Sequence, residues 1–181
     1  KLIQEADKND QPFFMVVSSA DSHRPFHGDP FNPNIPFWGN GKFEINIKDP
    51  SRIYKPEEVI IPPTLPDIPE IRNDLAKYAS SARRLDDTVG ACLSVLDEMS
   101  KNTSTLVIFV SDNGMPLPYG KFDCFMGSNR SPFLMRWPEG IKKPVKNKED
   151  LVSLMDITPT VLELANLPIP SPMDGKSLVP F

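Results

Sequence analysis

Residues 106–114 read LVIFVSDNG, and this stretch decides the fold that we expect for the chain. An unbroken apolar run as short as Leu106 to Val110 is typical of a strand buried on both faces, as in a parallel sheet. The run leads directly into Asp112, Asn113 and Gly114. Ligands of open α/β sheets bind beyond the carboxyl ends of the strands, so candidate chemistry is expected at the end of this strand.

Three further segments have the character of strands. The apolar run Phe13–Val17 also suits a strand buried on both faces, and polar residues that include His23 follow it. Residues 132–137 predict a third strand, and residues 151–155 predict a short fourth one. The sequence therefore offers several strands for one central sheet.

The longest periodic pattern predicts a helix that begins near Asp67 and runs to Met99. Asp67 followed by Glu70 is the pattern of a capping box at a helix start. Apolar or small residues then recur at steps of four and three, which favours a helix packed on a sheet over a coiled coil. The members of this stripe are Ile71, Leu75, Tyr78, Ala82, Leu85, Val89, Cys92, Leu96 and Met99.

Shorter helices are expected at the two ends of the chain. Residues 1–9 have the pattern of a helix end, and Thr158 before Pro159 resembles an N-cap followed by proline at the first helical position, with Asn166 closing the helix. Strand, helix, strand, strand and helix in this order predict an α/β domain of three layers, a sheet with flanking helices. A chain of 181 residues has the size of one domain.

The composition excludes several classes of protein. A hydrophobic fraction of 39% is ordinary for a globular chain, and a formal net charge of -4 gives no indication of nucleic-acid binding, which would need a basic face. No apolar run approaches the roughly 18 residues of a membrane helix. Cys92 and Cys124 alone do not make a disulfide framework. Many of the 21 prolines lie in residues 25–69, where Phe37 and Trp38 mark a candidate selectivity loop.

Asp112 and Asn113 are candidate metal ligands. A carboxylate beside an amide carbonyl offers hard oxygen donors, which suit Ca²⁺ or Mg²⁺ rather than zinc or copper. Two ligands do not complete the shell of such a cation, so others must come from elsewhere. An Asp-Asn-Gly turn held by local hydrogen bonds is the alternative that the spacing leaves open.

Lys121 and His23 are the basic candidates. Lys121 carries a compact charge suited to an anionic oxygen, although a solvated surface lysine would look the same. His23 could donate to an anion, act as a general acid or bind a metal, and a histidine with a purely structural role is its alternative. Cys124 has no identifiable base to make it a nucleophile.

The ordered set of these blocks resembles the sulfatase family of the alkaline-phosphatase-like superfamily. The most specific block is the strand that ends in Asp112, Asn113 and Gly114, and Gly120-Lys121 fits the block after it. The resemblance spans nearly the whole chain and implies the alkaline-phosphatase-like α/β fold. The other matching blocks are Gln11–Val17 with His23–Phe26, Pro66–Arg72 with Leu85–Gly90, Pro132–Pro138, Met155–Thr160 and Asp174–Leu178.

The resemblance implies a role for four residues. Asp112 and Asn113 match the pair that binds a divalent cation in the family, with Ca²⁺ expected before Mg²⁺. His23 and Lys121 match the residues that contact the sulfate group, so they are the expected catalytic and substrate-binding residues. A cation, a lysine and a histidine aimed at sulfate oxygens stabilise the charge that develops there. His23 could also protonate the leaving alcohol.

Two features of the family are missing from the sequence. Its nucleophile is a formylglycine made within a Cys/Ser-x-Pro-x-Arg signature, and no such string occurs in residues 1–181. The paired aspartates that supply the remaining metal ligands are missing too. Neither Lys1 nor Phe181 looks like a natural terminus, so we expect a segment of a longer protein, with both features N-terminal to it and with no activity of its own.

The expected function is part of a sulfatase that hydrolyses sulfate esters or sulfamates, with a sulfated small molecule or glycan as substrate. Two alternatives remain. One is a phosphodiesterase or phosphonate hydrolase of the same superfamily, and the other is a non-catalytic binding protein that keeps the scaffold. The resemblance also implies an exported location, periplasmic, extracellular or lysosomal. The oligomeric state does not follow from the sequence.

Overall fold

The computed structural model describes residues 2–30 and 48–180, so Phe37 and Trp38 lie outside the described residues. The chain divides into two compact units. Unit 1 comprises Lys1–Thr105 and Asn113–Arg130, and unit 2 comprises Leu106–Asp112 and Ser131–Phe181. Each contains helices, and the mixed helix and strand content agrees with the expected α/β class.

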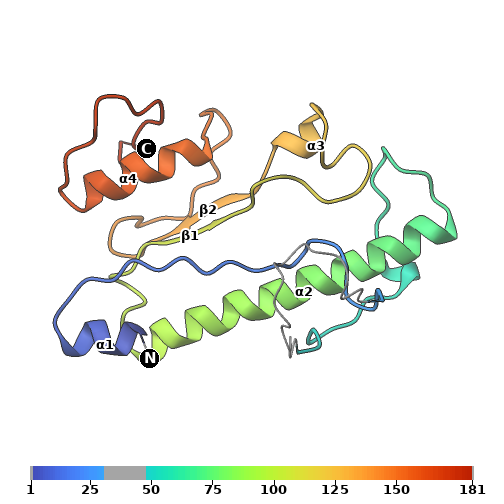
Figure 1. Ribbon diagram of the computed structural model, residues 1–181, viewed down its shortest axis with the longest axis horizontal. Helices are drawn as coiled ribbons and strands as arrows, with labels where there is room; N and C mark the ends of the chain where they lie inside the picture. Colours follow the sequence, from blue (N-terminus) through green and yellow to red (C-terminus); the bar gives the residue numbers. More distant parts are fainter. Residues whose placement is uncertain (1, 31–47, 181) are drawn as a thin grey trace, which may run out of the picture. The chain divides into compact units, whose positions relative to one another are not determined.

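The helix α2, Pro69–Glu98, dominates unit 1 and confirms the prediction from the apolar stripe (Figure 1). Its start differs from the predicted one. The N-cap residue is Ile68, whose side chain makes no capping hydrogen bond. The predicted capping box at Asp67 is wrong, because its carboxylate accepts hydrogen bonds from the Arg72 guanidinium instead, at 2.5 and 2.7 Å.

The core of unit 1 lies against the first half of α2. Leu65, Leu75 and Leu117 are buried together there. Half-buried side chains that pack around them belong to Val59, Ile61, Ile71, Tyr78 and Met115. The short helices of this unit are α1 (Leu2–Lys8), as expected for residues 1–9, the 3-10 turn η2 (Pro56–Glu58) and α3 (Met126–Asn129).

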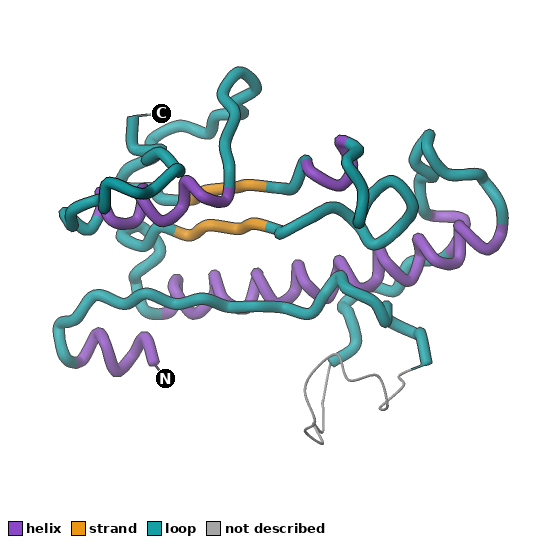
Figure 2. The backbone as a smooth tube through the Cα atoms, turned by 45° about the horizontal axis from the view of Figure 1, so that its top comes forward, coloured by secondary structure: helices purple, strands orange, loops and turns teal. Residues whose placement is uncertain are grey.

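The predicted strand Phe13–Val17 is wrong. Residues 11–20 form an extended chain along α2 in both views of the backbone (Figures 1 and 2). Phe14, Val16 and Val17 are exposed rather than buried on two faces. A strand forms only where a neighbour supplies hydrogen-bonding partners, and no segment in the described part of the chain forms a ladder with these residues.

Unit 2 holds the two strands of the sheet. β1 (Val107–Val110) and β2 (Phe133–Arg136) confirm the strands expected in residues 105–111 and 132–137. They pair antiparallel, with Val107 opposite Arg136 and Val110 opposite Phe133, and not in the expected parallel arrangement (Figure 2). Val107 to Phe109 are only half-buried and Val110 is exposed, because the sheet of the described residues has two strands.

The end of unit 2 is helical where a fourth strand was predicted. Leu154–Asp156 form the 3-10 turn η3, which overlaps the end of the expected strand 151–155, because Ser153 and Asp156 cap it with their side chains, and residues 151–153 form no strand. The helix α4, Ile157–Leu164, follows directly. Its N-cap is Asp156 and not Thr158, while Asn166 has a positive φ of 54° just beyond the helix, as expected for its end.

Candidate active site

The four candidate residues are distributed between the two units. His23, Asn113 and Lys121 belong to unit 1, and Asp112 is the last residue of the β1 segment of unit 2. Residues 112–114 form a bend one residue after β1, which is compatible with the turn that the Asp-Asn-Gly sequence favours. The metal-ligand role of Asp112 and Asn113 is compatible with this turn and stays a prediction.

Close main-chain contacts bring the stretches next to Asn113 and Lys121 together. The Gly114 N–H donates to the Ser128 carbonyl at 3.1 Å. A Cβ atom at Gly114 would overlap the carbonyl oxygens of Gly120 and Gly127. Only glycine lets two main chains approach this closely, so the residue after Asn113 and the residue before Lys121 are neighbours in space.

His23 lies in a loop that contacts the loop carrying Asn113 and Lys121. Its backbone N–H donates to Ala20, and its Nδ1 atom lies 2.6 Å from the Arg24 carbonyl oxygen. A carbonyl oxygen only accepts, so this contact requires the proton on Nδ1. The Arg24 side chain donates to the Pro116 carbonyl at 3.4 Å, which links the His23 loop with the loop that carries Asn113 and Lys121.

Side chains of α2 hold the His23 loop, a role that the sequence did not predict for them. Arg84 forms two hydrogen bonds of 2.8 Å with the Asp21 carboxylate. These bonds raise the pKa of the Arg84 guanidinium above its ordinary value. Arg24 likewise pairs with Asp74, and the hydrogen bond between them raises the pKa of the Arg24 guanidinium. The pattern that could have indicated these residues is a row of polar side chains at helical spacing beside the apolar stripe.

The donor chemistry of Asp112 and Asn113 fits a hard cation. The Asn113 amide nitrogen donates to the Gly114 carbonyl at 2.9 Å, so its Oδ1 atom is the one that can coordinate a metal. Asp112 is exposed and offers a carboxylate. Residues 2–30 and 48–180 contain no cluster of three or more His, Cys, Asp or Glu side chains that could hold a metal ion. The pair thus supplies only part of a cation's shell.

The loop that carries Lys121 contains several aromatic side chains. Its ammonium group lies 5.1 Å from the centre of the Phe122 ring, in a cation–π contact, and Phe122 is 94% exposed. Tyr119 and Phe125 pack edge to face, with ring centres 5.2 Å apart. Cys124 is an exposed free thiol in the same loop, and Cys92 is also free.

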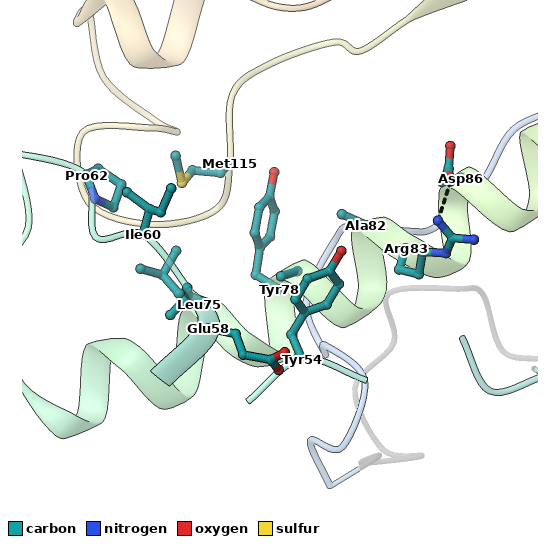
Figure 3. A pocket seen from close by; sticks show the side chains of 12 residues that line it. Tyr54, Glu58, Ile60, Pro62, Leu75, Tyr78, Ala82, Arg83, Asp86 and Met115 are labelled. Atoms are coloured by element: carbon teal, nitrogen blue, oxygen red, sulfur yellow. Dashed lines mark ion pairs between the residues drawn. The ribbon is translucent and has the colours of Figure 1, made fainter. Parts of the chain in front are cut away.

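A hollow of about 560 Å³ opens beside α2 in unit 1 (Figure 3). Leu75, Tyr78 and Met115 form part of its wall. Its charged lining groups pair with protein groups, because Arg83 pairs with Asp86 and Glu58 pairs with Arg52. The hollow is therefore an exposed part of the core with a mainly apolar lining, and none of the four candidate residues lines it.

No helix in the described ranges is both long enough and apolar enough to span a bilayer.

Several known proteins with related sequences are named as sulfatases or as a sulphohydrolase. The chain is 35% identical to the N-sulphoglucosamine sulphohydrolase of Homo sapiens over 192 residues, which cover 99% of the chain and 38% of that relative. It is 29% identical to an ulvan-active sulfatase of Formosa agariphila, over 97% of the chain and 33% of the relative. It is 27% identical to an arylsulfatase of Clostridium perfringens, over 93% of the chain and 37% of the relative.

The chain thus spans between a third and two fifths of the length of these relatives. The model of the sulfatase family matches residues 1–167, which is most of the sequence and includes all four candidate residues. Of the blocks noted in the sequence, those from Gln11 to Thr160 lie within this match, and the block Asp174–Leu178 lies beyond it. The chain therefore belongs to the sulfatase family.

Proposed function

We propose that the protein containing this chain hydrolyses sulfate esters or sulfamates of sulfated carbohydrates. Membership of the sulfatase family is the observation that carries the proposal. The names of the relatives support it, since they include a sulphoglucosamine sulphohydrolase and an ulvan-active sulfatase. The chain contributes His23, Lys121, Asp112 and Asn113 to this activity.

Asp112 and Asn113 would hold a divalent cation, with Ca²⁺ favoured over Mg²⁺ because both donors are hard oxygens and the pair leaves room for further ligands. When bound, such a cation supplies positive charge to the oxygens of the sulfate group. The nucleophile is a formylglycine that lies outside residues 1–181, since the sequence contains no Cys/Ser-x-Pro-x-Arg string.

Lys121 and His23 act on the substrate itself. Lys121 places an ammonium group against a non-bridging sulfate oxygen. The Nδ1 proton of His23 is directed to the Arg24 carbonyl, so Nε2 is the atom that meets the substrate. In the imidazolium form Nε2 donates a proton to the leaving oxygen or nitrogen, and the neutral ring that remains still holds its proton on Nδ1.

The alternatives are less well supported. A phosphodiesterase or phosphonate hydrolase would share the cation chemistry, but the matched family and the relatives' names concern sulfate. A non-catalytic binding protein would need none of the four residues, and all four are present. An exported location belongs to the same proposal, by family resemblance.

The test uses the full-length protein with an aryl sulfate, sulfated sugars and a matched phosphodiester. We expect sulfate release, and we expect Asp112→Ala or His23→Ala to lower kcat/KM by about 10²–10³-fold. Asp123→Asn is the matched control, because the Asp123 carboxylate, in the Lys121 loop, accepts a hydrogen bond from the Phe125 backbone N–H. Unaltered activity in Asp112→Ala would remove that residue from the metal role, and preference for the phosphodiester would favour the first alternative.

Residues 1–181 expressed alone should release no sulfate, because the nucleophile is absent from them. Release at the rate of the full-length protein would contradict the placement of the nucleophile outside this chain.

A further inference from the structure

One face of α2 carries a row of four polar residues. Asp74, Lys77, Ser81 and Arg84 are spaced by three, four and three positions, which places them one above another on the helix. The row occupies residues 74–84 of α2, beside the apolar stripe that contains the buried Leu75.

Every member of this row contacts the loop that contains His23, residues 21–29, which we name the histidine loop. The contacts occur along the whole loop, before and after His23 in the sequence. They are the Asp74 carboxylate with Arg24 at 3.2 Å, Lys77 with Asp29 at 2.7 Å, the Ser81 hydroxyl with the His27 N–H at 2.7 Å, and Arg84 with Asp21 at 2.8 Å.

The contact between Arg84 and Asp21 is the best shielded ion pair of the row. Their side chains are only 15% and 12% exposed, whereas Arg24 in the pair with Asp74 is 42% exposed. The Nε and Nη2 atoms of Arg84 each donate to one carboxylate oxygen, so the pair has fork-to-fork geometry. Such a pair fixes direction as well as distance, and it holds the chain two residues before His23.

The neighbouring arginine provides a contrast. Arg83 has the same charge and also forms ion pairs, at 3.1 Å with both Asp86 and Asp87. Its Nε atom donates to the Ser51 hydroxyl, in a segment other than the histidine loop. Two adjacent arginines of one helix therefore hold two different parts of unit 1.

We propose that Arg84 is a positioning residue for His23, acting through Asp21. This inference rests on the proposed function, in which the His23 imidazole meets the sulfate ester. A proton donor is effective only when it is held at the right distance and angle, and a displacement of about 1 Å can cost about 10²-fold in rate. The Arg84–Asp21 pair supplies that constraint from the rigid helix, and Asp74, Lys77 and Ser81 complete it.

The experiment compares Arg84→Gln with Arg83→Gln in the full-length protein. We expect Arg84→Gln to lower kcat by about 10- to 100-fold with a smaller change in KM, since orientation of the donor is lost. Arg83→Gln should stay within about twofold of the unaltered protein, because its pairs are more exposed and lie outside the histidine loop. Equal kinetics in the two variants would overturn the proposal.

Hydrogen–deuterium exchange of peptides covering residues 20–30 gives a readout that is independent of activity. Exchange should become faster in Arg84→Gln and stay unchanged in Arg83→Gln. Arg84→Lys keeps the charge but not the fork, so it should recover only part of kcat. Asp21→Asn combined with Arg84→Gln should be no worse than either alone, because both remove the same pair. Additive losses would contradict action through Asp21.

His23→Ala separates this inference from the proposed function. If His23→Ala keeps full activity, the role of His23 is wrong, while the exchange data still report whether Arg84 holds the loop. If His23→Ala is inactive but Arg84→Gln exchanges and reacts like Arg83→Gln, the proposed function stands and the positioning role is wrong. If Arg84→Gln does not fold, Arg84→Lys and Asp21→Asn provide the same comparison.

Discussion

The two halves of α2 share one apolar period but differ in their surroundings. Residues 69–87 contain Leu75, Ala76, Ser80 and Ser81, all buried, and they hold the histidine loop as well as the segment around Ser51 and Tyr54. Residues 88–98 contain Leu96 as the buried residue of that half, with Gly90 and Val95 exposed. An apolar period thus predicts a helix, whereas the segments that pack on it decide which part is enclosed.

The largest expected difference between the halves concerns their apolar side chains. Leu75→Ala should lower the free energy of unfolding by about 2–5 kcal/mol, because it empties space in the core formed with Leu65 and Leu117. Val95→Ala, on the exposed side of the second half, should cost less than about 1 kcal/mol. Urea denaturation of the purified protein measures the free energy of unfolding of both variants. Equal losses would show that the two halves of α2 are equally enclosed.

Two serines test the same difference with matched chemistry. Ser80 and Ser94 both donate to the carbonyl four residues earlier, at 2.8 and 3.0 Å. Only Ser80 is buried, and its hydroxyl also accepts from the Tyr54 N–H. Ser80→Ala should therefore cost about 1–3 kcal/mol, because that N–H loses its acceptor, whereas Ser94→Ala should change stability by less than about 0.5 kcal/mol. Comparable urea midpoints for the two variants would contradict this reasoning.

Acid should weaken the attachment of the histidine loop to the first half of α2, because Asp29 of that loop pairs with Lys77. Burial opposes ionisation of its carboxyl, but hydrogen bonds from Lys77 and the Phe26 N–H prevail and lower its pKa below the ordinary 3.8. A lowered pKa gives stability that is present above the unfolded value and is lost as pH falls through the folded value. Asp29→Asn should cost about 1–2 kcal/mol at pH 7 and less below pH 3.8. Urea midpoints measured at both pH values give the test, and a cost that does not depend on pH would exclude the charge as its source.

The smallest expected effect belongs to the second half. Gly90 lies inside α2, and a Cβ atom there would have no other atom within 4 Å. Gly90→Ala should stabilise the protein by up to about 1 kcal/mol, because alanine loses less backbone entropy in a helix. A rise in melting temperature checks this, and a fall would show that another segment covers Gly90.

Long elements could be predicted from the sequence, and strand pairing could not. The period of α2 and the apolar runs of β1 and β2 identify these elements because their signals are local. Phe13–Val17 has the same apolar character as β1, yet it joins no ladder among the described residues. A strand depends on its neighbours in space, which a local pattern does not contain.

For the candidate site too, the sequence predicts the local features but not the contacts between distant segments. The order of blocks indicates His23, Asp112, Asn113 and Lys121 through family resemblance, and their roles stay predictions. The contacts that hold the histidine loop join residues 48 to 63 positions apart, such as Lys77 with Asp29 and Asp21 with Arg84. Local spacing shows that Asp74, Lys77, Ser81 and Arg84 share a helix face, but it does not show which loop they hold.

The glycine contacts of the Lys121 loop determine which of its side chains can be substituted. Gly114, Gly120 and Gly127 meet main chain to main chain, so the course of this loop is held by backbone atoms at three fixed points. Side chains between these points, such as Phe122 and Phe125, are exposed and take no part in that packing. Substitution of an exposed side chain such as Phe122 should therefore change the surface beside Lys121 while the path of the loop is kept.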